Sequence, residues 1–392
     1  MTAVRADVPA FPFLPTTVGE PPVEFARLRA EPMTRVVLPT GDVAWLATRY
    51  DDVLTVLTDP RLSRAATTEP DAPRLGPMRP NPRSLMAMDP PRHTDLRLLV
   101  APMFTKPRIE SMRARIESAV DELLDLLDAV DRRAELNAGL SRPLAMTVIC
   151  DLLGVPVDDR ADFERWTEQS LSVRPDAGAA VQHARTALRD YLTRLASTPT
   201  DDGEGLFATL SDTVPVDDAV ELAATLLTAG YHTVWTAITN SIVVLFRHPG
   251  ELDALRRDRS LLPAAVEELL RYAPGPVSGG TIRVATADLE IGGVRVRAGE
   301  AVIPATTSAN RDRATFDAAD RVRFDRHPNP HIAFGAGAHR CLGRHLARLE
   351  LQAALGGLLE RFPALRPAIA VDNLTWRVEA MMGSVTELPV TW

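Results

Sequence analysis

Residues 331–350 read HIAFGAGAHRCLGRHLARLE, and the cysteine in this stretch is the point from which the rest of the chain can be understood. Gly335 and Gly337 allow backbone conformations with positive φ, so the segment before Cys341 can fold into a tight loop. An apolar helical rhythm follows and runs to about Phe362. Cys341 therefore lies where a loop turns into a helix. The N–H groups and the positive dipole end of a helix start favour a thiolate over a thiol.

A thiolate that is the only protein ligand suits an iron atom whose other ligands come from a porphyrin. Such a strongly donating ligand favours cleavage of an O–O bond on the opposite face of the iron. The simpler interpretation of Cys341 is a buried structural cysteine, which is the usual environment of an unpaired one. That interpretation does not explain why six of the ten positions 334–343 carry the specified residues Phe334, Gly335, Gly337, His339, Cys341 and Gly343. We therefore favour the haem-thiolate interpretation.

The loop resembles the haem-binding loop of the cytochrome P450 family, and it matches the signature of that family at every specified position. The resemblance implies that the Cys341 thiolate is the axial ligand of haem b. It also implies that Phe334 packs beside this ligand and that His339 reaches a haem propionate. Gly335 and Gly343 lack side chains, which lets the backbone approach a bulky cofactor closely.

A second segment, residues 90–97, reads PPRHTDLR and is predicted to open a helix with proline in its first turn. His93 and Arg97 are four residues apart, so both project from one face of that helix. Such a pair is ordinarily a solvated helix face. The resemblance implies instead that the two residues hold the haem propionates, with Arg283 as a third contact, and a bidentate Arg suits a carboxylate.

A long helix is predicted from about Val216 to Arg247, and it would span roughly 45–50 Å. Ala229 and the glycine after it thin this helix, which would leave room for a ligand beside the haem. Thr233 can donate its hydroxyl proton to the carbonyl one turn back. The family resemblance implies that this threonine holds bound dioxygen and delivers protons.

The sequence departs from the family pattern at His232, where the family has Asp or Glu. A histidine can relay protons because it titrates near neutral pH, or it can point outwards and take no part. Two reaction outcomes therefore stay open. One is hydroxylation; the other is oxidative C–C or C–N coupling of an aromatic substrate, such as a tryptophan- or tyrosine-containing cyclic dipeptide, without oxygen insertion.

The run Glu267–Tyr272 contains Glu268 and Arg271, which can pair on one helix face. An exposed pair of this kind contributes little to stability. The resemblance implies a buried network in which Arg326 is the third partner and which fixes the loop that bears Cys341.

Several segments are expected to border a substrate. The long connection from Leu62 to Pro91 is predicted to cover it, because structureless stretches of such length are usually functional or disordered. Aliphatic, aromatic and Met side chains dominate the predicted pocket, which suits a mid-sized apolar or aromatic molecule. The predicted pocket residues are Leu85, Met86, Met88, Tyr231, Trp235, Val277, Ser278, Met381 and Met382.

The composition bounds the remaining possibilities. The chain has 392 residues and a formal charge of −8, without a basic stripe suited to nucleic acid. We expect one domain over residues 1–392, with the mainly helical, triangular cytochrome P450 fold and β-rich parts at about 35–50, 277–303 and 375–392. The sequence contains no apolar run long enough for a membrane span and no signal peptide. Two cysteines, of which one is the proposed ligand, favour the reducing cytoplasm.

The resemblance to bacterial, actinobacterial-type members of the family implies an enzyme that activates dioxygen to oxidise a secondary metabolite. Electrons would come from a separate ferredoxin and its reductase, and the protein would be a monomer. Arg340, Arg344, His345 and Arg348 would form the docking surface, where positive charge can steer an acidic partner; the alternative, which stays open, is that they form an ordinary solvated helix face. The alternatives are a haem protein without catalysis and an enzyme that uses peroxide and needs no redox partner.

Overall fold

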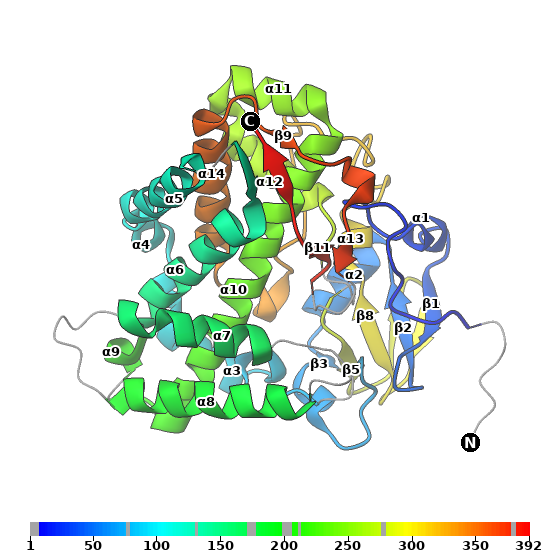
Figure 1. Ribbon diagram of the computed structural model, residues 1–392. Coiled ribbons are helices and arrows are strands. Elements are labelled where there is room, and N and C mark those ends of the chain that lie inside the picture. Colours follow the sequence, from blue (N-terminus) through cyan, green and yellow to red (C-terminus); the bar gives the residue numbers. More distant parts are fainter. Residues whose placement is uncertain are drawn as a thin grey trace. The chain divides into compact units, whose positions relative to one another are not determined.

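The computed structural model describes residues 8–75, 79–129, 132–170, 178–197, 206–210, 213–275, 280–377 and 382–392. Its contacts divide the chain into two compact units, one formed by residues 1–94 with 267–341 and the other by residues 95–266 with 342–392. Helices predominate and strands form a smaller part, so the predicted fold class is confirmed (Figure 1). The expected single domain stays a prediction.

The first unit holds most of the strands. Its largest sheet has the strand order β1-β2-β8-β5-β3, in which only the β2–β8 pair is parallel among the pairs described. The strands are β1 (Met33–Val37), β2 (Val43–Ala47), β3 (Leu62–Ser63), β5 (Arg283–Ala285), β6 (Leu289–Ile291), β7 (Val294–Val296) and β8 (Ala301–Pro304). The helices that lie within this unit are α1 (Glu24–Leu28), α2 (Tyr50–Thr58) and α13 (Thr306–Ala309).

The β-rich part predicted at about residues 35–50 contains a hairpin formed by β1 and β2. Its strands pair antiparallel from Met33 opposite Ala47 to Val37 opposite Val43. Gly41 has φ +84°, a conformation that a glycine adopts without strain, which explains the position of the turn.

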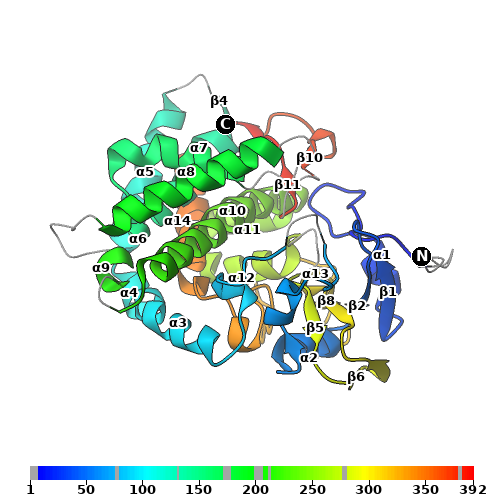
Figure 2. The ribbon, with the colours of Figure 1, turned by 90° about the horizontal axis from the view of Figure 1, so that it is seen from below.

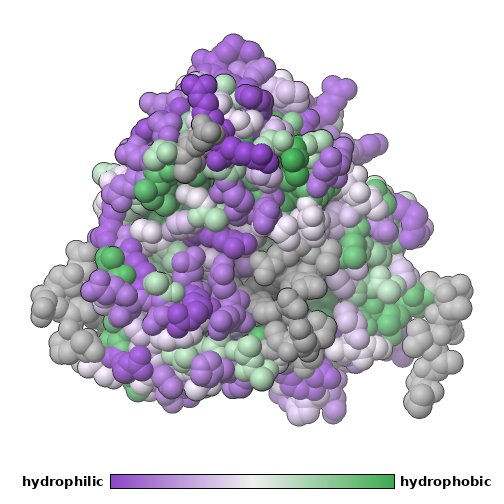
Figure 3. Space-filling view, in the orientation of Figure 1, coloured by the Kyte–Doolittle hydropathy of each residue, from purple (hydrophilic) through white to green (hydrophobic). Residues whose placement is uncertain are grey.

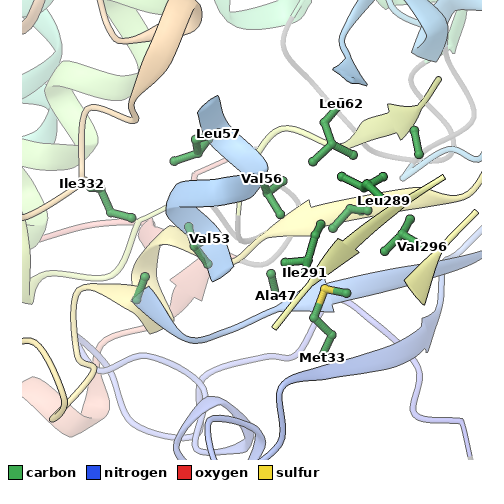
Figure 4. Close-up of a cluster of buried hydrophobic side chains, with 13 residues drawn as sticks. Met33, Ala47, Val53, Val56, Leu57, Leu62, Leu289, Ile291, Val296 and Ile332 are labelled. Atoms are coloured by element: carbon green, nitrogen blue, oxygen red, sulfur yellow. The ribbon is translucent and has the colours of Figure 1, made fainter. Parts of the chain in front are cut away.

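The core of the first unit forms between α2 and the sheet. Val53, Val56 and Leu57 follow the helical spacing of one face and are buried in a cluster with residues of β2 and β8 (Figure 4). Ile332, just before the cysteine loop, belongs to the same cluster. The entry of the cysteine loop is therefore anchored in this core.

The second unit is mostly helical. Its helices are α4 (Lys106–Glu110), α5 (Arg113–Asp128), α6 (Arg142–Leu153), α7 (Arg160–Ser170), α8 (Gly178–Ser197), α9 (Leu206–Leu210), α10 (Val216–Arg247), α11 (Pro249–Arg257) and α14 (Arg344–Arg361). Its short strands are β4 (Arg133–Glu135), β9 (Arg366–Pro367), β10 (Trp376–Arg377), β11 (Ser384–Val385) and β12 (Pro389–Thr391). Two further helices, α3 (Arg92–Val100) and α12 (Leu262–Tyr272), each begin in one unit and end in the other.

Helix α10 is the long helix predicted from the sequence, and its bounds match the prediction. It begins after Pro215 and ends before Pro249, because proline fits the first turn of a helix but not its interior. Helices α6 and α8 lie alongside it, and α8 also packs against α7 (Figure 2).

The face of the molecule drawn in Figure 3 is largely hydrophilic, with hydrophobic residues in small scattered groups. Such a distribution is ordinary for a surface in water. Among the described residues, no helix combines the length and the hydropathy needed to cross a bilayer.

Candidate active site

The cysteine loop is closed by backbone hydrogen bonds. The N–H of Cys341 donates to the carbonyl of Phe334 over 2.8 Å, so the two ends of the loop are held together. Gly335 and Gly337 have φ +66° and +69°, which a residue with a side chain rarely adopts. Helix α14 begins three residues after Cys341, and the predicted position at a loop-to-helix junction is therefore observed.

The glycines of this loop serve different purposes. A Cβ at Gly337 would lie 2.5 Å from the carbonyl oxygen of Leu57, so this glycine lets the loop pack onto the end of α2. A Cβ at Gly335 would meet nothing within 4 Å, and one at Gly343 would have the ring of Phe104 as its nearest neighbour at 4.0 Å. Each of these two positions, taken within its own unit, therefore leaves open space where a side chain would otherwise lie.

Basic side chains from separate segments of the first unit meet near this loop. The ring centroids of His93 and His339 are 4.2 Å apart. Arg64 and Arg283 are both buried, and each acts electrostatically on His339. Burial, with the two arginines and His93, lowers the pKa of His339 to about 3.

The charge of this cluster is not balanced by carboxylates of the described chain. Burial lowers the pKa of Arg64 and of Arg283 to about 10 each, and Asp89 is the one carboxylate that opposes this shift. The Nε–H of Arg283 is buried and has no acceptor among the described residues. Buried cations need anionic partners. The two propionates of a haem would supply them, so the residues present fit the cofactor that the sequence predicts.

Arg64 was not predicted from the sequence. Nothing in the local pattern distinguishes it from Arg61, which is half exposed and forms an ion pair with Asp59 at 2.6 Å. Arg97, which was predicted, is half-buried one turn after His93 on α3.

The predicted network of Glu268, Arg271 and Arg326 is brought together in the structure. Arg271 donates two hydrogen bonds to the carboxylate of Glu268, at 2.7 and 2.8 Å, and Arg326 Nε approaches the same carboxylate at 3.0 Å. Arg271 also donates to the carbonyls of Asn310 and Ala319. The charges are buried but fully hydrogen-bonded, which such a network requires.

Helix α10 carries the residues predicted to handle dioxygen and protons. The hydroxyl of Thr233 donates to the carbonyl of Ala229, as expected from its place one turn later. Ala229 is exposed and Thr233 is half-buried, whereas His232 is buried with its ring edge-on to Trp235 at 5.3 Å between centroids. The helix remains continuous through this region.

Two pocket predictions on α10 need correction. Tyr231 is buried and donates its hydroxyl proton to Glu168 of α7 over 2.8 Å, and Trp235 is buried with the Arg142 guanidinium 4.9 Å from its ring. At 100° per residue both lie on the face of α10 opposite to Thr233. They therefore belong to the packing of α10 against α6 and α7.

Gly230 also differs from its expected use. A Cβ there would come within 2.8 Å of the Ile149 side chain on α6. This glycine therefore lets two helices approach each other, and the prediction that it makes room for a ligand was wrong.

The remaining residues predicted to line the pocket differ in how exposed their side chains are. Met86 is exposed, whereas Leu85 and Met88 are buried in the short turn around Leu85–Ala87. Met382 is half-buried. Val277, Ser278 and Met381 lie outside the described residues.

Comparison with known proteins agrees with this geometry. The sequence pattern of the family described as Cytochrome P450 matches residues 179–368. The chain is 41% identical to nocardicin C N-oxygenase of Nocardia uniformis subsp. tsuyamanensis, over 99% of this chain and 100% of that protein. Among solved structures, a putative thioether synthase of griseoviridin tailoring is 39% identical with a TM-score of 0.93, covering 99% of this chain and 100% of that one. A cytochrome P450 with biaryl coupling reactivity is 35% identical with a TM-score of 0.89, covering 95% and 97%.

The 41% identity to an N-oxygenase over the full length of both chains, together with the complete cysteine loop, establishes the family. The chain is a bacterial cytochrome P450, a monooxygenase that holds haem b through the thiolate of Cys341.

Proposed function

We propose that this cytochrome P450 inserts one oxygen atom of dioxygen into a mid-sized apolar or aromatic secondary metabolite, with electrons from a separate ferredoxin and its reductase. The observation that carries the proposal is the closed loop that presents Cys341 at the start of α14. Bound haem b with a thiolate ligand supplies the activation of dioxygen.

The residues of the chain would contribute positioning and protons. His93, Arg283 and His339 would bind the propionates and orient the cofactor. The hydroxyl of Thr233 would hold a proton on the side of α10 that faces the haem, and His232 would pass protons towards that hydroxyl. The network of Glu268, Arg271 and Arg326 would hold the cysteine loop in place, because its hydrogen bonds fix the chain that leads into the loop.

Relatives support oxygen insertion into a natural product. The name of nocardicin C N-oxygenase states that this relative oxygenates its substrate. The exposed Met86 in the turn at Leu85–Ala87 gives an apolar side chain for such a substrate to meet.

Turnover with labelled dioxygen tests the proposal. A panel of aromatic and polyketide compounds is first screened for ligand-induced shifts of the haem spectrum, and the compounds that shift it are incubated with a surrogate ferredoxin, its reductase and labelled dioxygen. We expect the label in the product. Turnover supported by peroxide alone, with no gain from the redox partners, would contradict the role of ferredoxin.

Oxidative coupling is the second candidate. Histidine stands at the position where the family has an acid, and one structurally similar cytochrome P450 has biaryl coupling reactivity. Both are specific reasons to retain it. A product that joins two aromatic groups and carries no label would favour coupling over insertion.

Arg340, Arg344, His345 and Arg348 are proposed to dock the acidic ferredoxin. Exchange of Arg340, the exposed member of this group, for Glu should slow haem reduction by ferredoxin and weaken its dependence on salt, because exposed charges steer association. Reduction by dithionite, which needs no docking, serves as the control.

A further inference from the structure

We propose that Arg64 is a further positioning residue of the haem site. It joins the segment that carries Met86 to the strand that carries Arg283, and its positive charge raises the reduction potential of the haem. The first part rests on the proposed substrate-covering role of the segment around Met86, and the second part does not.

The hydrogen bonds of Arg64 connect two segments that are distant in the sequence. Its Nε–H donates to the carbonyl of Met86 over 2.8 Å, and its Nη1 donates to the carbonyl of Ile282. Ile282 directly precedes Arg283, the first residue of β5. One guanidinium therefore fixes the backbone both beside a predicted propionate ligand and at the predicted cover of the substrate.

Asp89 binds the backbone of Arg64 and the side chain of the preceding residue. The Arg64 backbone N–H donates to Asp89 Oδ1 over 2.9 Å, and the hydroxyl of Ser63 donates to Asp89 Oδ2. These bonds engage the carboxylate with the main chain and a hydroxyl, and no bond between Asp89 and the guanidinium of Arg64 is observed. The charge of Arg64 is therefore only partly offset at short range.

Arg64 also acts on the other basic groups of the site. The positive charge of Arg283 adds to burial in lowering the pKa of the buried Arg64. A residue with a purely structural role would not need to carry a charge into a cluster that is already positive. Burial of such a charge is costly unless an anion is bound beside it.

Geometry and charge can be separated by substitution. Lysine keeps the positive charge but lacks the planar fork that donates to two carbonyls at once. Methionine removes both. Arg61→Met is the matched control, because Arg61 is close in sequence but exposed and paired with Asp59.

The first measurement is the reduction potential of the substrate-free haem protein. A nearby positive charge stabilises the reduced haem, which carries one positive charge less than the oxidised form. We expect a lower potential for Arg64→Met, a value near that of the parent for Arg64→Lys and for Arg61→Met, and a higher potential for Asp89→Asn. If Arg64→Met does not take up haem, the potential of Asp89→Asn still measures the effect of charge at this site.

The second measurement compares the binding of imidazole, which reaches little beyond the iron, with that of phenylimidazole, which extends into the pocket. We expect Arg64→Lys to weaken phenylimidazole about two- to tenfold more than imidazole, the effect of roughly one lost hydrogen bond. Equal effects on both ligands would overturn the positioning role. An unchanged potential in both Arg64→Met and Asp89→Asn would overturn the charge role. Neither assay uses a metabolite substrate or turnover, so failure of the proposed reaction would leave both results interpretable.

Discussion

The imidazole rings of His93 and His339 lie 4.2 Å apart between centroids, with an angle of 44° between their planes. The first residue is in the opening turn of α3, and the second ends the turn Gly337–His339 that precedes the cysteine. Two segments that are far apart in the sequence thus bring their basic side chains to one place. The relationship makes the propionate role of both residues testable.

Replacement of His339 by Gln should accelerate loss of haem by roughly ten- to a hundredfold, the effect of one hydrogen bond to a charged group. Transfer of haem to apomyoglobin measures this rate directly. His327→Gln is the control, because His327 is exposed. Equal transfer rates for the two variants would show that His339 makes no contact with the propionates.

The two cysteines should respond differently to substitution by serine. Cys341→Ser removes the thiolate, so the Soret band of the reduced carbon monoxide complex should lose its thiolate-type position. Cys150 is buried in α6, and burial raises the pKa of its thiol to about 12, which leaves it inert. Cys150→Ser should therefore keep the thiolate-type band, and loss of that band in this variant would contradict our assignment.

The network around Glu268 should contribute to stability through its burial. Removal of one partner leaves a buried charge uncompensated, so Arg326→Met should lower the free energy of unfolding by about 3 kcal/mol or more. Arg323→Met is the control, since its side chain is exposed and pairs with Asp325, and exposed pairs of this kind contribute little to stability. Urea denaturation measures the free energy of unfolding of both variants. Equal decreases in the two variants would show that the buried network contributes no more than an exposed ion pair.

If His232 delivers protons, its removal should slow turnover and increase peroxide release at the same time. His232→Ala should slow turnover about tenfold or more and divert electrons to peroxide, as loss of a positioned proton donor does. Thr228→Ala is a control on the same helix, because Thr228 makes the same kind of hydrogen bond to the backbone as Thr233. Unchanged turnover and peroxide release in His232→Ala would show that the buried ring has only a packing role beside Trp235.

The sequence predicted best what local chemistry determines. The β-rich part at about 35–50, the bounds of α10 and the tight loop before Cys341 were predicted from short motifs, flanking prolines and the loop glycines. Arg326 was found because the family pattern fixes its spacing from the cysteine loop.

Predictions from the sequence were poorest for side chains whose surroundings are set by segments that are distant in the sequence. Tyr231 and Trp235 were predicted to line the pocket because they are on the long helix α10, but the helical turn of 100° per residue places them on the face opposite to Thr233. Arg64 was missed for a related reason. Its partners Met86 and Ile282 are contributed by distant segments, and no spacing within the sequence reveals them.

Glu350 of α14 provides a test of how burial links stability to pH. It is buried, and burial raises its pKa well above the usual range of a glutamate. Between the ordinary pKa and the raised one, the folded chain retains a proton that the unfolded chain has released. The stability contributed by the protonated group is therefore complete at low pH and is lost as the pH rises towards the folded pKa.

Glu350→Gln removes this proton linkage without changing the shape of the side chain. We expect the variant to be more stable than the parent at about pH 8 and to differ less at about pH 5, near the ordinary pKa of Glu. Urea denaturation followed by tryptophan fluorescence at both pH values measures the difference. Glu360→Gln is the control, because Glu360 is exposed near the end of the same helix. Parallel pH dependences for the parent and Glu350→Gln would mean that Glu350 stays ionised in the folded protein, held by a compensating cation.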